Sequence, residues 1–70
     1  MDNKNLGNLI RVRRENLALK QEDLSEMSGV NLRTIYLIEN AQGNPSLKTL
    51  VKLLEVLGLE IKVQIKEITG

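Results

Sequence analysis

The side chains able to exchange protons are carboxylates, lysines, arginines and one tyrosine, because the chain contains no cysteine and no histidine. These absences exclude disulfide bonds, thiolate metal sites, imidazole-bound zinc and a Ser-His-Asp triad. The acidic residues Glu22, Asp23 and Glu26 have the spacing of a helix surface and not of a carboxylate pair in a cleft. We therefore expect no enzyme, no cofactor and no metal, and a function in binding.

The formal net charge of +1 hides an uneven distribution of charge along the chain. Residues 1–20 hold five basic and two acidic side chains, residues 21–40 hold one and four, and residues 41–70 hold four and three. Folding could gather the basic residues on one face to meet phosphate, or they could form an ordinary solvated surface. The charge count does not decide between a nucleic-acid binder and another binding protein.

The chain has 70 residues, which is enough for one domain only. Small domains usually need a disulfide, a metal or a partner subunit for stability, and only the subunit is left here. No apolar run approaches the ~18 residues of a membrane span, and residues 1–5 hold no apolar segment of a targeting signal. We expect a cytoplasmic protein with no membrane partner.

Helical periodicity dominates residues 5–58, so the predicted fold class is all-α with four to five short helices. The predicted helices cover residues 5–16, 21–27 and 32–40, and a fourth begins near Pro45 or Ser46 and is ended by Gly58. Gly29 suits a left-handed turn and Asn31 suits an N-cap, whereas Lys20 is a poor N-cap. The expected inward-facing residues are Leu6, Leu9, Ile10, Leu17, Leu24, Ile35, Ile38, Leu47, Leu50, Val51, Leu54 and Leu57.

Residues 59–66 change to strict alternation of apolar and polar side chains, which predicts a β-strand. Its apolar face consists of Leu59, Ile61, Val63 and Ile65. Nothing else in the chain has a strand pattern, so we expect this strand to pair antiparallel with its copy in a homodimer. Pairing centred on Val63 would place Glu60 opposite Lys66 of the second copy. Residues 1–58 and 59–70 are thus a helical part and a dimerisation segment of one domain.

Residues 21–39 have the spacing of a helix-turn-helix. A small residue, Ser25, stands where two steeply crossing helices would touch, and Gly29 stands where the turn needs a positive φ. Apolar residues occupy the inner positions, namely Leu24, Val30, Ile35 and Ile38.

Together these segments resemble the Cro/repressor-type (XRE-like) helix-turn-helix family, whose fold is lambda-repressor-like. The matching segments are IRVRR (10–14), LKQEDL (19–24), GV (29–30), TI (34–35), IEN (38–40) and PSLKTL (45–50). The sequence departs from the family pattern at Lys20, where Ser or Thr is usual, and at Ala18 and Ala41, where Gly is common. The final segment, residues 59–63, resembles HipB-type antitoxins, in which a C-terminal strand pairs between two subunits.

The resemblance implies that residues 32–40 form a recognition helix in the DNA major groove. The implied base-reading residues are Asn31, Leu32, Arg33, Thr34 and Leu37. Arg33 is the first candidate, because a guanidinium can bond guanine O6 and N7 together. Leu32 and Leu37 suit thymine methyl groups if they are exposed, and peripheral core packing is the alternative.

The resemblance also implies contacts with the DNA backbone and an internal ion pair. The implied phosphate-binding residues are Gln21, Tyr36, Asn40, Gln42, Gly43 and Lys48. Arg14 and Glu39 stand at the positions of a partly buried ion pair that orients the recognition helix. Arg11 and Arg13 are expected to be surface cations, with contact to a DNA phosphate as the alternative.

The predicted function is a homodimeric, sequence-specific regulator of transcription that acts as a repressor on a palindromic operator of double-stranded DNA. One alternative is an antitoxin that also binds a toxin protein, and another is a restriction–modification controller. A third is a protein-interaction module that keeps the fold without binding DNA, as the two leucines and the acidic residues 22–23 would allow.

Overall fold

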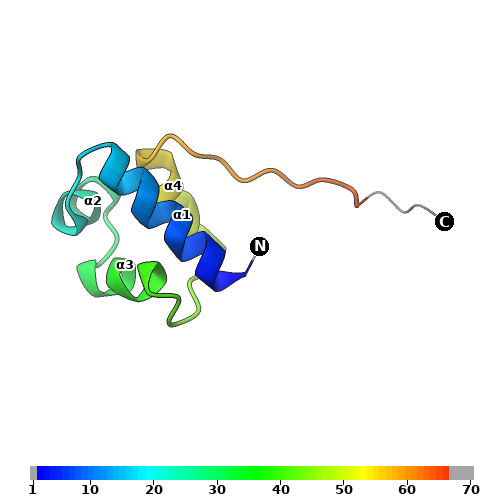
Figure 1. Ribbon diagram of the computed structural model, residues 1–70, viewed down its shortest axis with the longest axis horizontal. Helices are drawn as coiled ribbons and strands as arrows, with labels where there is room; N and C mark the ends of the chain where they lie inside the picture. The colour runs from blue at the N-terminus through cyan, green and yellow to red at the C-terminus, as the bar shows by residue number, and fades with distance from the viewer. Residues whose placement is uncertain (1, 67–70) are drawn as a thin grey trace.

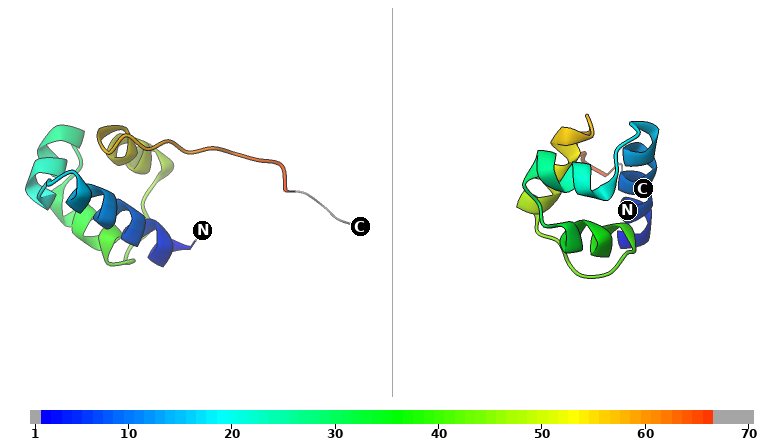
Figure 2. Two further views of the ribbon diagram at one scale, coloured as in Figure 1. Left: turned by 45° about the horizontal axis from the view of Figure 1, so that its top comes forward. Right: turned by 90° about the vertical axis from the view of Figure 1, so that its left-hand side faces the viewer.

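Four helices form the folded part of the computed structural model, which describes residues 2–66 (Figure 1). They are α1 (Asn3–Asn16), α2 (Gln21–Ser28), α3 (Leu32–Glu39) and α4 (Leu47–Val56). Helix α1 packs on α3, and α2 packs on both α3 and α4, so that α3 lies along one edge of the bundle (Figure 2). The predicted all-α fold is confirmed, with four helices in the described residues. None of these helices has the length and apolar character needed to cross a membrane.

The helix boundaries differ from the predicted ones by one or two residues. Helix α1 begins at Asn3, because the Asp2 carboxylate accepts a hydrogen bond from the Asn5 backbone N–H at 2.8 Å. Helix α2 reaches Ser28 before Gly29 turns the chain, and α3 ends at Glu39. Lys20 has no acceptor in its side chain to cap α2. Its own backbone N–H donates to the Asp23 carboxylate at 2.8 Å, which is half of a capping box.

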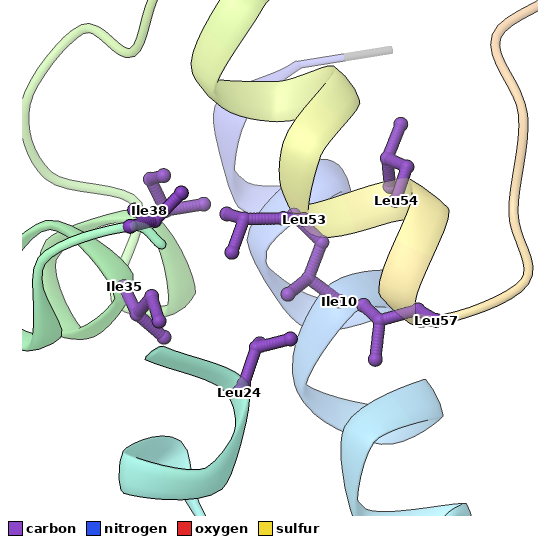
Figure 3. Close-up of a cluster of buried hydrophobic side chains, with 8 residues drawn as sticks. Ile10, Leu24, Ile35, Ile38, Leu53, Leu54 and Leu57 are labelled. Carbon is purple, nitrogen blue, oxygen red and sulfur yellow. The ribbon is translucent and has the colours of Figure 1, made fainter. Parts of the chain in front are cut away.

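Eight buried side chains from all four helices and the α2–α3 turn form the core (Figure 3). They are Ile10, Leu24, Val30, Ile35, Ile38, Leu53, Leu54 and Leu57. Four residues expected to face inward, Leu9, Leu17, Leu47 and Val51, are 38–65% exposed, and Leu53 is fully buried instead. The apolar face of α4 is wide, because only Lys48, Lys52 and Glu55 form a polar stripe, and packing against α2 decides which part of that face is buried.

Three of the four helices end in the same hydrogen-bonded turn, in which one residue has a positive φ. That residue is Ala18 after α1, Ala41 after α3 and Gly58 after α4, with φ of 57°, 58° and 70°. The N–H of the next residue donates to the carbonyl five residues earlier at 2.8–3.1 Å, which defines a Schellman motif. Alanine is strained in this conformation and glycine is not. The two departures from the family's glycines are therefore sites of local backbone strain.

Residues 59–66 leave the bundle as a tail that forms no strand in the described part of the chain (Figure 1). Leu59 is anchored against the core, whereas Ile61, Val63 and Ile65 are 46%, 95% and 98% exposed. A strand needs a hydrogen-bonded partner, and the rest of the described chain is helix and loop. The strand and its pairing with a second copy therefore stay predictions. Residues 67–70 of the predicted dimerisation segment lie outside the described residues.

Substituting Ala18→Gly or Ala41→Gly should stabilise the protein by about 1 kcal/mol each, because glycine removes the left-handed strain. For a domain of this size the gain corresponds to a rise in Tm of roughly 4–8 °C. Thermal unfolding followed by circular dichroism at one protein concentration measures it. The matched control is Gly58→Ala, which places alanine in the same motif of α4 and should lower Tm by a similar amount. Equal Tm values for all three variants and the parent chain would contradict the assignment of strain.

Candidate nucleic-acid interface

The turn between α2 and α3 is held by one small side chain and one glycine. The Ser25 hydroxyl is half-buried and donates to the Val30 carbonyl at 2.6 Å. Gly29 has a φ of 76°, and a Cβ placed on it would meet no atom within 4 Å. Gly29 is thus required by its backbone conformation and not by lack of space. The turn fixes where α3 begins on the surface.

The first turn of α3 presents polar groups toward solvent. The Asn31 Oδ1 atom accepts from the Arg33 backbone N–H at 2.8 Å, as expected of an N-cap. This hydrogen bond leaves the Asn31 amide Nδ2 as a donor for a partner outside the protein. Arg33 is exposed and takes part in none of the ion pairs found among residues 2–66. Its guanidinium is therefore available to a ligand.

Three further predicted base-reading residues follow on α3. Leu32 is 39% exposed, while Thr34 and Leu37 are half-buried, and neither leucine belongs to the core cluster. Thr34 and Leu37 share the wall of a hollow of about 210 Å³, which we call the α3 hollow. Its other walls come from Ile38 and the following loop, at Gln42, Gly43, Asn44 and Pro45. The fold therefore brings two predicted base-reading residues beside two predicted phosphate-binding residues.

The remaining predicted phosphate-binding residues lie at separate places around α3. Tyr36 is 51% exposed, and its carbonyl accepts from the Asn40 side-chain amide at 2.8 Å. Lys48 is exposed in the first turn of α4. Gln21 is half-buried at the start of α2, and its amide donates to Glu39 at 3.1 Å. Gln21 is thus joined to the ion pair that sequence reasoning treated separately.

Arg14 and Glu39 form a two-bond ion pair between α1 and the end of α3. Arg14 Nε donates to Glu39 Oε2 at 2.8 Å, and Nη2 donates to Oε1 at 2.9 Å. The exposed fractions of the two side chains are only 12% and 2%. The hydrogen bond to Glu39 raises the pKa of Arg14 above its ordinary value, and burial opposes this rise. Arg14 Nη1 also donates to the Leu19 carbonyl at 2.8 Å, so all three guanidinium nitrogens are bonded.

Two residues behind this surface have structural roles that sequence reasoning did not predict. Gly7 is buried where α1 meets the end of α3, and a Cβ placed on it would overlap the Ile38 carbonyl oxygen. Arg13, expected to be a surface cation, is half-buried and donates from Nε to the Leu57 carbonyl at 2.8 Å. The sequence signal that could have revealed the close approach at Gly7 is a glycine inside a predicted helix.

Replacing Glu39→Gln should destabilise the protein by about 3 kcal/mol, because the charge of Arg14 stays partly buried without its counter-ion. The control is Glu15→Gln, which breaks the exposed pair with Arg11, whose side chains are 45% and 54% exposed. That change should cost less than about 1 kcal/mol. Urea unfolding followed by circular dichroism gives both free energies. Equal losses for the two variants would show that the buried pair does not hold α3.

The matched family model supports the fold. Residues 10–63 match a family described as helix-turn-helix, a range that contains the whole of α2, α3 and α4. A protein of Haemophilus influenzae described as an uncharacterized HTH-type transcriptional regulator is 42% identical over 50 residues, which make up 71% of this chain and 51% of that protein. The chain thus spans about half the length of that relative. Since the family model covers more than half of its residues, the chain belongs to the helix-turn-helix family.

Proposed function

We propose that this chain is a sequence-specific DNA-binding regulator of transcription that acts by binding and not by catalysis. The observation that carries the proposal is the exposed start of α3, where the guanidinium of Arg33 and the side-chain amide Nδ2 of Asn31 have no partner among residues 2–66. A guanidinium and an amide are the groups that read guanine and adenine edges in the major groove. The relative named as a transcriptional regulator supports the same assignment.

A single α3 of eight residues reads few base pairs, so we propose that two copies bind a palindromic operator. The half-sites would lie ~34 Å apart, one turn of DNA. Occupying such an operator blocks access of other proteins, which makes the chain a repressor. An antitoxin would share this step and add a toxin partner, and a toxin-like reading frame beside the gene is the observation that separates the two functions.

The exposed tail and an apolar groove support the homodimer. The groove measures about 310 Å³ and lies between α1, α4 and the start of the tail. Its lining residues are Leu6, Leu9, Leu54, Leu59, Glu60, Ile61 and Lys62. Residues 59–66 contain no Gly, Pro, Asn or Asp to turn the tail back on its own groove. Val63 and Ile65 therefore need a partner from outside, and a second copy offers both a matching strand edge and a matching groove.

Substituting Arg33→Ala should lower the affinity for the preferred DNA site by roughly 5- to 150-fold and relax the preference at one base position. Arg33→Lys keeps the charge but loses the two-bond geometry, so it should lose the preference while keeping more of the affinity. Selection of binding sites from random DNA, followed by sequencing, gives the preference, and salt-dependent gel shifts give the affinity. A parent chain that binds all sequences equally, or that binds without sensitivity to salt, would refute the proposal.

Substituting Val63→Glu should raise the dissociation constant of the dimer by at least about tenfold, because two like charges would face each other across the two-fold axis. The control is Gln64→Glu, which adds the same charge to the neighbouring residue on the other face of the strand. Sedimentation equilibrium over a range of concentrations measures dimerisation, and circular dichroism checks that the helices remain. A monomeric parent chain, or equal dimerisation of both variants, would contradict strand exchange.

A further inference from the structure

A polar hollow lies beside the end of α3, on the side formed by α1. It measures about 370 Å³, and we call it the α1 hollow. Its walls are Lys4, Asn5, Asn8 and Arg11 of α1 together with Glu39, Asn40 and Ala41. The spacing of residues 4, 8 and 11 places two cations and one amide on a single face of the helix. The hollow therefore gathers donors from two elements that are distant in sequence.

The chemistry of the α1 hollow favours an anion. Asn8 Oδ1 accepts from Arg11 Nη2 at 2.5 Å, so the Asn8 amide Nδ2 is left to donate to a ligand. Glu39 adds little negative charge, because its carboxylate is bonded to Arg14 twice and its side chain is 2% exposed. Lys4 takes part in none of the ion pairs found among residues 2–66.

The ion pair that already occupies Arg11, with the Glu15 carboxylate, is weak. Arg11 Nη1 donates to Glu15 Oε1 at 3.1 Å, and both side chains are about half exposed. Exposed pairs of this kind contribute little to stability. A phosphate entering the hollow can replace Glu15 as the partner of Arg11 at small cost, and a bidentate guanidinium–phosphate contact is the stronger of the two.

The position of the hollow indicates which phosphate would reach it. Gly7 holds α1 directly against the carbonyls of Ile38 and Glu39, so the row of residues 4, 8 and 11 flanks the last turn of α3. Asn40, which lines the hollow, also begins the loop that carries two further phosphate-binding candidates, Gln42 and Gly43. A duplex that takes α3 into its major groove has a phosphate chain along each edge of that groove.

We propose that the α1 hollow binds a DNA-backbone phosphate, with Lys4 and Arg11 as its cations and Asn8 and Asn40 as neutral donors. This site rests on the DNA binding proposed above and adds α1 to the interface. Its contacts are with phosphate alone, so it strengthens binding to every sequence equally and fixes how α3 sits in the groove.

The test measures how the DNA-binding constant of the full chain depends on salt. Lys4→Gln and Arg11→Gln should each reduce the slope of log K against log salt by about 0.9 per subunit, or about 1.8 for a dimer. The affinity should fall by the same factor for the selected site and for unrelated DNA. The control is Lys52→Gln, which removes one exposed charge from the polar face of α4 and should leave the slope unchanged.

A gain of binding provides the opposite check. Glu15→Gln removes the competing carboxylate, so it should tighten binding to all sequences by roughly two- to fivefold without changing the sequence preference. If the parent chain binds DNA but Lys4→Gln and Arg11→Gln behave like Lys52→Gln, the α1 hollow is not a phosphate site and the proposed function stands. If the parent chain shows no salt-dependent DNA binding, both proposals fail.

Discussion

The buried carboxylate of Glu39 is the point on which the arrangement of α3 depends. Helix α3 has eight residues, too few to be stable or oriented by its own hydrogen bonds. Its last residue accepts two hydrogen bonds from Arg14 of α1 and one from Gln21 of α2, so three helices meet at one side chain. A desolvated ion pair contributes little net stability, but it tolerates few alternative geometries. We interpret the pair as an orienting device, which fits a helix that must present its opposite end to a ligand.

Helix α1 connects the Arg14–Glu39 ion pair to the rest of the molecule. Neighbouring side chains on it serve two different helices, because successive residues point about 100° apart. Arg14 holds the end of α3, and Arg13 donates to the Leu57 carbonyl at the end of α4, where the tail begins. Gly7, one to two turns earlier, lets α1 approach α3 closely. In the proposed homodimer the same helix would therefore fix both the exit of the dimerisation segment and the direction of α3, and so the spacing between the two copies of α3.

Local patterns were sufficient for much of this fold. Helix positions, the Gly29 turn and the Asn31 cap follow from periodicity and side-chain chemistry within a few residues. Tertiary choices were not accessible in this way. The apolar face of α4 is wide enough to include both Val51 and Leu53, and packing against α2 buries Leu53. Arg13 is half-buried because its guanidinium donates to a carbonyl 44 residues away. The tail could not be decided from the sequence for another reason. Its alternating side chains predict a strand, but residues 2–66 contain no second strand to pair with it. For the candidate interface, residue types indicated Arg33 and Asn31, but the grouping of Lys4, Asn8 and Asn40 required the packing of α1 on α3.

The net charge of +1 gives a misleading impression of the surface available to DNA, because several charges are engaged inside the protein. Arg13 and Arg14 bind carbonyls and a buried carboxylate, so they offer little to a ligand. The carboxylates of Asp23 and Glu39 are likewise occupied, by a helix cap and by Arg14. These internal contacts leave the net charge unchanged, but they change which charges face solvent. Lys4 on α1, Arg33 on α3 and Lys48 on α4 remain exposed. Phosphate affinity depends on such local clusters within a Debye length of ~10 Å, and not on the sum over the chain. A nearly neutral protein can therefore bind DNA through one face, and the placement of that face is set by the packing of α1 against α3.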